Sequence, residues 1–210
     1  MRLPLFDHYS VVRLEAAEAR RFICRHHYSG GCHNNPTGWG LIAPSGDLHG
    51  VCAFASPVSE NVRASVFGAP FVACVTELHR LVVLDAAREA GVHTSWFVAQ
   101  TLKHLSSLRP ELRAVLSFAD PAENHHGGIY RACNFAFAGT TVPERFWRDP
   151  SGRLHHPRNN GKNVSARQAA ARGWTAEKRP GKARYIFFLG TQRQRRWARK
   201  NCQLELLPYP

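Results

Sequence analysis

Residues 117–141 read SFADPAENHHGGIYRACNFAFAGTT, and this stretch decides the fold class. The apolar runs AVLSFA (114–119) and FAFAG (135–139) have the length and composition of buried strands. Between them stands a polar segment with an aspartate, two histidines, paired glycines and a tyrosine, in which HHGGIYRACN (125–134) predicts a short helix. Two strands joined through a helix indicate an α/β sheet, and the polar connection is a natural place for chemistry.

The rest of the chain continues this alternation. Apolar periodicity and turn residues predict the following further elements: strands over 8–14, 73–84 and 183–190, a β-hairpin over 38–55, and helices over 15–28, within 85–105, over 163–173 and over 191–201. Ser165 and Gln168 have the spacing of a capping box. We expect a central mixed sheet flanked by helices, with a core over 1–141 and a basic segment over 142–210 that also supplies the last strand.

Composition narrows the class of protein. The 210 residues are 44% hydrophobic, which favours one globular domain with a small appendage. There is no apolar run of membrane-spanning length and no apolar region of a signal peptide after MRLPLFDHYS, so we expect a cytoplasmic protein without a membrane partner. The six cysteines are scattered without a C-x-x-C pair, which fits free thiols in a reducing compartment.

Charge is concentrated in the last third. Residues 1–141 hold 12 Lys+Arg against 11 Asp+Glu, whereas residues 142–210 hold 16 against 4. Because tryptophans are interleaved with these cations, the segment favours nucleic-acid contact over an ordinary solvated face. The side chains predicted to contact double-stranded DNA are Arg145, Arg148, Arg153, Arg158, Lys162, Arg167 and Lys182.

Two motifs resemble the GNAT acyltransferases. In LVVLDAAREAGVHTSW (81–96), Arg88, Gly91 and His93 stand where that family has an R-x-x-G-x-G/A loop that grips coenzyme A, although His93 replaces the final small residue. In ENHHGGIYRACNFAFAG (123–139), Asn124 and Tyr130 match a family segment whose tyrosine protonates the leaving thiolate. The alternatives are an ordinary loop and a tyrosine that packs in the core.

Three pieces together resemble a narrower family. RHHYSGG (25–31), ELHRLVV (77–83) and SFADPAENHHGGIYRA (117–132) are similar to the phage Mom DNA-modification proteins, a divergent GNAT-like family. The resemblance spans roughly residues 20–141, with a looser match over 181–210. The resemblance implies conversion of adenine N6 in DNA to a carbamoylmethyl-type base, which shields the DNA from host restriction enzymes. It also implies iron, Fe(II), as a cofactor, while the small-molecule donor stays unknown, with acetyl-CoA as one candidate.

The same resemblance carries over functional residues. They are His27, Tyr28, Arg80, Asp120 and Tyr130, with Ser117 as a weaker match. Adenine N6 is a poor nucleophile, so an enzyme must accept its proton and polarise the electrophile. Asp120 can accept the proton and Arg80 can orient a carbonyl group. The alternatives are a structural Arg80–Asp120 salt bridge and a helix end capped at His27.

Metal and base-extrusion sites are weaker expectations. His27, Asp120 and Tyr130 offer nitrogen and oxygen ligands that suit ferrous iron if they converge. A further alternative is a zinc site on Cys24, His26, Cys32 and His33, although the spacing of these residues is not that of a zinc finger. Extruding a paired base needs stacking side chains, for which the candidates are Trp39, Phe146 and Trp147.

Three other functions remain open. A coenzyme A-dependent N-acetyltransferase acting on a protein or small-molecule amine is supported by Arg88, Gly91 and Asn124. An adenine methyltransferase is suggested by the ADP at 119–121, but the following aromatic residue and a G-x-G turn are missing. A non-catalytic DNA-binding or packaging protein would use the basic segment alone. The nearly neutral first 141 residues, with polar groups at strand ends, argue against that third function.

Overall fold

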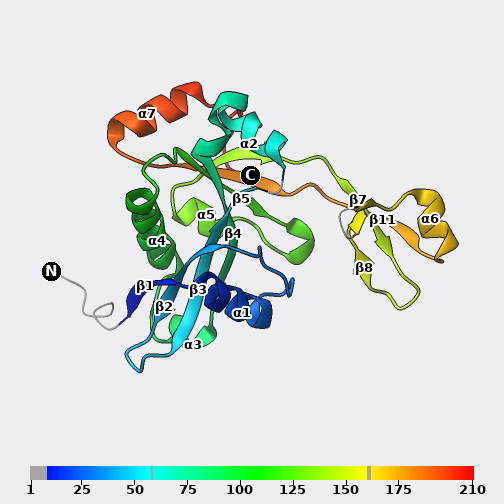
Figure 1. Ribbon diagram of the computed structural model, residues 1–210, viewed down its shortest axis with the longest axis horizontal. Coiled ribbons are helices and arrows are strands. Elements are labelled where there is room, and N and C mark those ends of the chain that lie inside the picture. The colour runs from blue at the N-terminus through cyan, green and yellow to red at the C-terminus, as the bar shows by residue number, and fades with distance from the viewer. Residues whose placement is uncertain (1–8, 58, 160–161) are drawn as a thin grey trace. The chain divides into compact units, whose positions relative to one another are not determined.

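The structure is a computed structural model that describes residues 9–57, 59–159 and 162–210. The chain divides into two compact units (Figure 1). Unit 1 comprises residues 1–117, 128–138 and 185–210, and unit 2 comprises residues 118–127 and 139–184. Both units are therefore discontinuous in sequence, and residues 142–210 contribute to each of them.

A seven-stranded sheet organises the fold, in the order β1-β2-β3-β4-β5-β12-β6. Its strands are β1 (Ser10–Leu14), β2 (Thr37–Ile42), β3 (Leu48–Ala55), β4 (Val75–Val83), β5 (Ala114–Ala119), β6 (Ala136–Thr140) and β12 (Ala183–Phe188). The pairs from β1 to β4 are antiparallel, whereas β4 and β5 are parallel. This mixed sheet confirms the predicted α/β class.

Helices cover both faces of the sheet. They are α1 (Ala16–His26), α2 (Glu60–Phe67), η2 (Ala69–Cys74), α3 (Asp85–Glu89), α4 (Thr94–Leu108), α5 (Gly128–Ala132) and α7 (Gln192–Asn201). Ile23 of α1 packs with Val51 and Ala53, whereas the Thr101 hydroxyl of α4 donates to Cys52 Sγ at 3.3 Å. Because successive strand residues point to opposite faces, α1 and α4 lie on opposite sides of β3.

Unit 1 contains two helical elements that the sequence did not predict. No element is predicted between the hairpin and the strand over 73–84, but α2 and η2 lie there. Only the last two residues of α2, Val66 and Phe67, are buried, so this helix shows no apolar stripe in the sequence.

Throughout the described ranges, every helix is too short or too polar to cross a bilayer.

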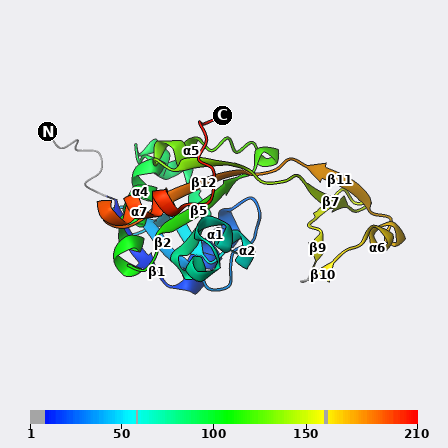
Figure 2. The ribbon, with the colours of Figure 1, turned by 90° about the horizontal axis from the view of Figure 1, so that it is seen from above.

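Unit 2 has its own small sheet, in the order β11-β7-β8. Its elements are η3 (Pro121–Glu123), β7 (Glu144–Arg148), β8 (Leu154–His155), β9 (Arg158–Asn159), β10 (Lys162–Asn163), α6 (Ala166–Ala171) and β11 (Thr175–Arg179). Figure 2 shows β9 and β10 side by side, as their antiparallel pairing requires. The predicted capping box of Ser165 and Gln168 is confirmed at the start of α6.

Candidate active site

The polar groups of unit 1 gather where β4 and β5 stop pairing. The parallel ladder ends at Glu77 and Leu116, although both strands continue, to Val83 and Ala119. There the Ser117 hydroxyl, which is fully buried, donates to the Leu78 carbonyl at 3.0 Å. The β3–β4 register also shifts beside this point, so that β4 has one extra residue, His79. Such bulges re-aim side chains and are common next to active sites.

Tyr130 of α5 lies among other aromatic rings. Its ring stacks on Tyr185 at 4.9 Å and packs against Phe135 at 5.4 Å. Burial raises the pKa of Tyr130 to about 12, and a hydrogen bond with Ser117 offsets part of that rise. The phenol therefore stays protonated at neutral pH and suits a proton donor.

Glu77 was not predicted as a site residue, and the structure places it at the last pair of the β4–β5 ladder. Glu77 and Tyr28 add to the raised pKa of Tyr130, after the larger effect of burial. The Glu77 carboxylate is 3.6 Å from His79 Nδ1, and the two side chains are only 17% and 15% exposed. A carboxylate in this position can accept a proton. The available signal was an acidic residue within a strand whose other residues are apolar, neutral polar or basic.

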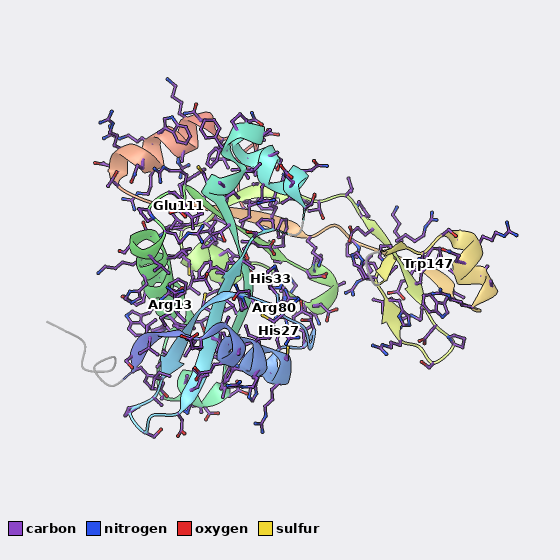
Figure 3. The ribbon with its side chains drawn as sticks, in the orientation of Figure 1. Arg13, His27, His33, Arg80, Glu111 and Trp147 are labelled. Carbon is purple, nitrogen blue, oxygen red and sulfur yellow. The ribbon has the colours of Figure 1, made fainter. Side chains whose placement is uncertain are left out.

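Arg80 ties β4 to the loop that follows α1. Its Nε donates to the Gly31 carbonyl at 2.9 Å and its Nη1 to the His79 carbonyl at 2.7 Å. A guanidinium has five N–H groups, so others remain for a substrate oxygen. Figure 3 shows Arg80 next to His27 and His33 in that view, and the Gly31 contact links the loop to β4.

His27 and Tyr28 lie at the end of α1. The His27 amide donates to the Ile23 carbonyl at 2.8 Å, and its Nδ1 lies 2.9 Å from the Ser29 hydroxyl. The His27 and Tyr28 rings are 4.3 Å apart, and Tyr28 is 58% exposed. His27 thus caps the helix, which is the alternative stated for it, and the exposed phenol of Tyr28 remains accessible to a substrate.

Asp120 belongs to unit 2 and has cationic partners there. Its Oδ1 accepts from the Ala122 amide at 3.1 Å, and Lys182 Nζ lies 3.3 Å from Oδ2. Arg179 lies 3.8 Å from Asp120 and donates to Glu123 at 2.8 Å. Lys182, predicted to contact DNA, is therefore also an intramolecular partner of Asp120. A pairing of Asp120 with Arg80 stays a hypothesis, as does its convergence with the other predicted catalytic residues.

The predicted donor loop is well ordered around Arg88 and Gly91. Arg88 Nη1 donates to the Val83 carbonyl at 3.0 Å, and its guanidinium also pairs with Asp85. Gly91 has φ +83°, a conformation that favours glycine. His93 is the N-cap residue of α4 and makes no side-chain cap hydrogen bond. The first amides of α4 therefore follow a braced loop without a side-chain cap, as an anion site at a helix start requires.

A cavity of about 690 Å³ runs along α4 from His93. Its polar lining includes Ser95, Lys103, Ser106, Asn134 and Arg195, and its apolar lining includes Trp96, Leu102, Cys133, Phe187 and Leu189. Two cations and an apolar wall suit a donor that carries both phosphates and an apolar arm. The residues present thus fit a coenzyme A-like molecule, even though His93 departs from the family pattern.

The metal expectations gain no support. Within the ranges that the structure describes, no group of three or more His, Cys, Asp or Glu side chains is arranged to hold a metal ion. This includes the zinc alternative on residues 24–33, where burial also raises the pKa of the Cys32 thiol. The iron site on His27, Asp120 and Tyr130 stays a prediction.

The predicted DNA-contacting side chains differ in their surroundings. Arg153 and Arg167 are exposed, Arg145 lies over the Trp147 ring at 6.0 Å, and Arg148 pairs with Glu177. The side chains of Arg158 and Lys162 lie outside the described part of the structure. None of these placements tests DNA contact, which stays a prediction for this set.

The prediction that Trp39 and Trp147 stack on an extruded base is wrong. Trp39 and Trp147 are only 3% and 5% exposed, because each packs in the interior of its unit. Trp39 lies in contact with Phe54, and Trp147 is paired between Ala176 and His155 in the small sheet. Phe146 is half-buried, with Arg179 over its ring at 5.5 Å.

Comparison with known proteins places the chain in a family and a fold. The model of the Mom protein family matches residues 8–210. No curated protein matches the chain. Three solved structures share its fold at a TM-score of 0.50.

The three are acetyltransferases from different bacteria. A putative acetyltransferase from Acinetobacter baylyi is 11% identical and covers 88% of this chain and 93% of its own. The ribosomal-protein-S5-alanine acetyltransferase from Vibrio fischeri is 10% identical, with 88% and 94% covered. A spermidine/spermine N-acetyltransferase from Vibrio cholerae is 10% identical, with 93% and 98% covered. At such identities the likeness shows the fold alone, which is the predicted GNAT-like one.

Proposed function

Because the chain belongs to the Mom protein family, we propose that it is a DNA-modifying transferase that converts adenine N6 in duplex DNA to a carbamoylmethyl-type base, which protects the DNA from host restriction. The observation that carries this proposal is the proton-handling cluster of Glu77, Ser117 and Tyr130 where β4 and β5 stop pairing. Arg80, on the same strand as Glu77, adds a cationic hydrogen-bond donor.

The proposed reaction needs two proton movements. A bond forms between adenine N6 and the donor carbon, the bond from that carbon to its leaving group breaks, N6 loses a proton and the leaving group gains one. Glu77 or Asp120 accepts the N6 proton as a carboxylate. Tyr130 supplies the other proton, because its raised pKa of about 12 keeps the phenol neutral. Arg80 orients a carbonyl oxygen of the donor.

The donor is proposed to bind along α4. The 690 Å³ cavity, with Lys103 and Arg195 in its lining, supports a phosphate-bearing molecule such as an acyl-coenzyme A. When bound, such a molecule would supply an activated acyl group and would yield an N6-acyl adenine, whereas a carbamoylmethyl base requires a donor that is attacked at its methylene carbon. The braced loop of Arg88 and Gly91 would hold its phosphates at the start of α4.

Duplex DNA as the partner is supported by the distribution of charge. Unit 2 contains 11 Lys+Arg against 5 Asp+Glu, and α7 adds five more cations, Arg193, Arg195, Arg196, Arg199 and Lys200. Cations on two elements can neutralise several phosphates, which gives affinity without choosing the base. Choice of adenine would then come from the catalytic residues.

Nucleoside mass analysis tests the proposal. The full chain is expressed in a bacterium, total DNA is digested to nucleosides, and these are weighed. We expect a new adenosine species with the wild-type chain, none with Tyr130→Phe, and an unchanged amount with the control Tyr9→Phe, whose hydroxyl bonds His49 instead. DNA free of any new species under iron-replete conditions would refute the function.

An N-acetyltransferase acting on a protein or small-molecule amine is the second candidate. The acetyltransferase fold and the α4 cavity favour it. Acetyl transfer to a peptide or polyamine amine, together with unmodified DNA, would establish this candidate in place of the first.

A further inference from the structure

A second cavity, of about 390 Å³, lies beside the first residues of β4. It is lined by residues of β2, β3, α2, η2, β4 and the end of α4. Its polar lining residues besides Arg109 are His33, Asn35, Thr37, Ser56, Arg63 and Thr76. Neither the Lys103 and Arg195 lining nor the loop at residues 88–93 belongs to it, so it is distinct from the proposed donor cavity.

Arg63 is the unusual residue in this cavity. Its Nε is fully buried and has no hydrogen-bond partner; among the described residues, only the indole nitrogen of Trp147 shares that condition. An unmade bond from a buried donor typically costs about 1–3 kcal/mol, and more for a charged group. Native proteins seldom leave such a group unpaired unless a ligand, ion or water completes it.

The rest of the lining favours an anionic oxygen ligand. It holds no Asp or Glu, so nothing in the wall neutralises Arg63. The other arginine of the lining, Arg109, already has a carboxylate partner in Glu111. His33 Nδ1 accepts from the Asn35 amide at 3.2 Å, so in the neutral ring Nε2 is the donor that remains. The lining therefore offers donors on Arg63 and His33 and contains no carboxylate to accept from them.

Size and the apolar wall limit the ligand further. The volume lies at the lower end of small-molecule sites, which span roughly 300–1,000 Å³. Phe54, Val72, Val75, Leu105 and Leu112 form the apolar part of the wall. A guanidinium recognises carboxylate oxygens in a bidentate fork, and the apolar wall suits the carbon portion of an organic acid.

We propose that this cavity is a binding site for a small organic carboxylate, held by the guanidinium of Arg63. The site adjoins the candidate catalytic groups, because Thr76 precedes Glu77 and the His33 ring lies 6.3 Å from that of His79. The inference does not depend on DNA modification, since the observations that carry it are the buried Arg63 Nε without a hydrogen-bond partner and the lining of the cavity.

Thermal unfolding of the full chain tests the site, with acetate, succinate or inorganic phosphate as probes. A carboxylate is expected to raise the melting temperature of the wild-type chain in a dose-dependent way, because a ligand that binds only the folded state stabilises it. Arg63→Met is expected to match or exceed the wild-type melting temperature without a probe, because it removes a buried donor that has no partner. It should also abolish the carboxylate-induced rise. The control Arg109→Gln, in the same lining, should keep that rise.

Other outcomes overturn the proposal. These are no rise with either carboxylate up to about 10 mM, an equal rise in Arg63→Met, or a rise with phosphate alone. If Arg63→Met does not fold, Arg63→Lys keeps the charge without the fork and should weaken binding at least about tenfold; wild-type affinity in that variant counts against the site. Binding is measured without DNA, so a failure of the proposed function leaves this result unaffected.

Discussion

The polar groups at the candidate site of unit 1 and the charged groups of unit 2 have different surroundings. Unit 1 buries uncharged hydroxyl groups there, as with Ser117, which is fully buried, and Tyr130, whose pKa is raised to about 12. Unit 2 pairs its charges, as Asp120 does with Arg179 and Lys182, and stacks cations on rings, as Arg172 does over Trp174 at 5.0 Å. A buried phenol with a raised pKa keeps its proton and is available for chemistry, whereas paired charges hold a small domain together.

The largest expected effect lies in unit 1. Tyr130→Phe should lower the initial rate of DNA modification by about 10²-fold or more, because a positioned proton donor contributes about 10²–10⁴-fold. Folding should be nearly unchanged, since the ring contacts with Tyr185 and Phe135 remain. The measurement is the amount of modified adenosine formed per unit time at equal concentrations of the variant and wild-type chains. A residual rate close to wild type would erase the contrast between the units.

Asp120 in unit 2 separates pairing from chemistry. Asp120→Asn should destabilise the chain by about 1–3 kcal/mol, because it leaves two cations without their shared carboxylate. The matched variant Arg179→Gln disturbs the same ion-pair network but keeps the Asp120 carboxylate. Denaturant unfolding measures stability, and the nucleoside assay measures rate. Loss of modification in Asp120→Asn alone would assign Asp120 to catalysis, and equal losses would assign it to the fold.

Salt dependence compares the paired cations of unit 2 with those of α7. No α7 side chain forms an ion pair within the described part of the chain, so its cations can neutralise phosphates directly. Removing Arg196 and Lys200 together should lower the slope of log K against log salt by about 1.8. Arg148→Gln should lower it by less than about 0.9, because Arg148 already pairs with Glu177. Equal slopes for both variants and the wild-type chain would exclude these cations from the DNA contact.

The smallest effect concerns acid stability in unit 2. A hydrogen bond with His155 holds the pKa of Asp149 well below its ordinary range, and one with Ser151 adds to this. Since the folded pKa is depressed, the stabilisation is present above the unfolded value of about 3.9 and is lost as the pH falls toward the folded value. Trp174 stacks on His155 at 4.3 Å, so its fluorescence should report the change. In Asp149→Asn the change in Trp174 fluorescence that comes from Asp149 protonation should disappear. A dependence of fluorescence on pH identical to that of the wild-type chain would show that the Asp149–His155 pair does not contribute to acid stability.

Much of the fold could be predicted because local patterns agree with it. The apolar run at 114–119 became β5 with the same bounds, and the hairpin over 38–55 became β2 and β3. The strands of unit 2 were harder to predict, since β7 has the sequence ERFWR, in which two charged residues precede two rings without the alternation of a half-buried strand. Its cations suggested a solvated or DNA-binding surface, while Trp147 between them forms part of the interior.

The candidate site was predictable only in part. Motif resemblance identified Arg80, Ser117 and Tyr130, and in the structure Ser117 affects the pKa of Tyr130. Glu77 and Arg63 were missed, because their significance comes from long-range neighbours: a phenol on α5 for Glu77 and an unneutralised wall for Arg63. The spacing of residues along the sequence does not predict which polar groups lack a partner in the folded chain.

The position of β12 has a consequence for how the chain folds. β5 and β6 are separated by few residues, yet β12 lies between them in the sheet and follows only after the whole of unit 2 has been synthesised. Until then both strands present unpaired edges, which attract other chains. Such non-local pairing slows folding. A fragment that ends before residue 183 should therefore aggregate rather than form a smaller enzyme, and co-expression of the missing segment should be needed to keep it dispersed.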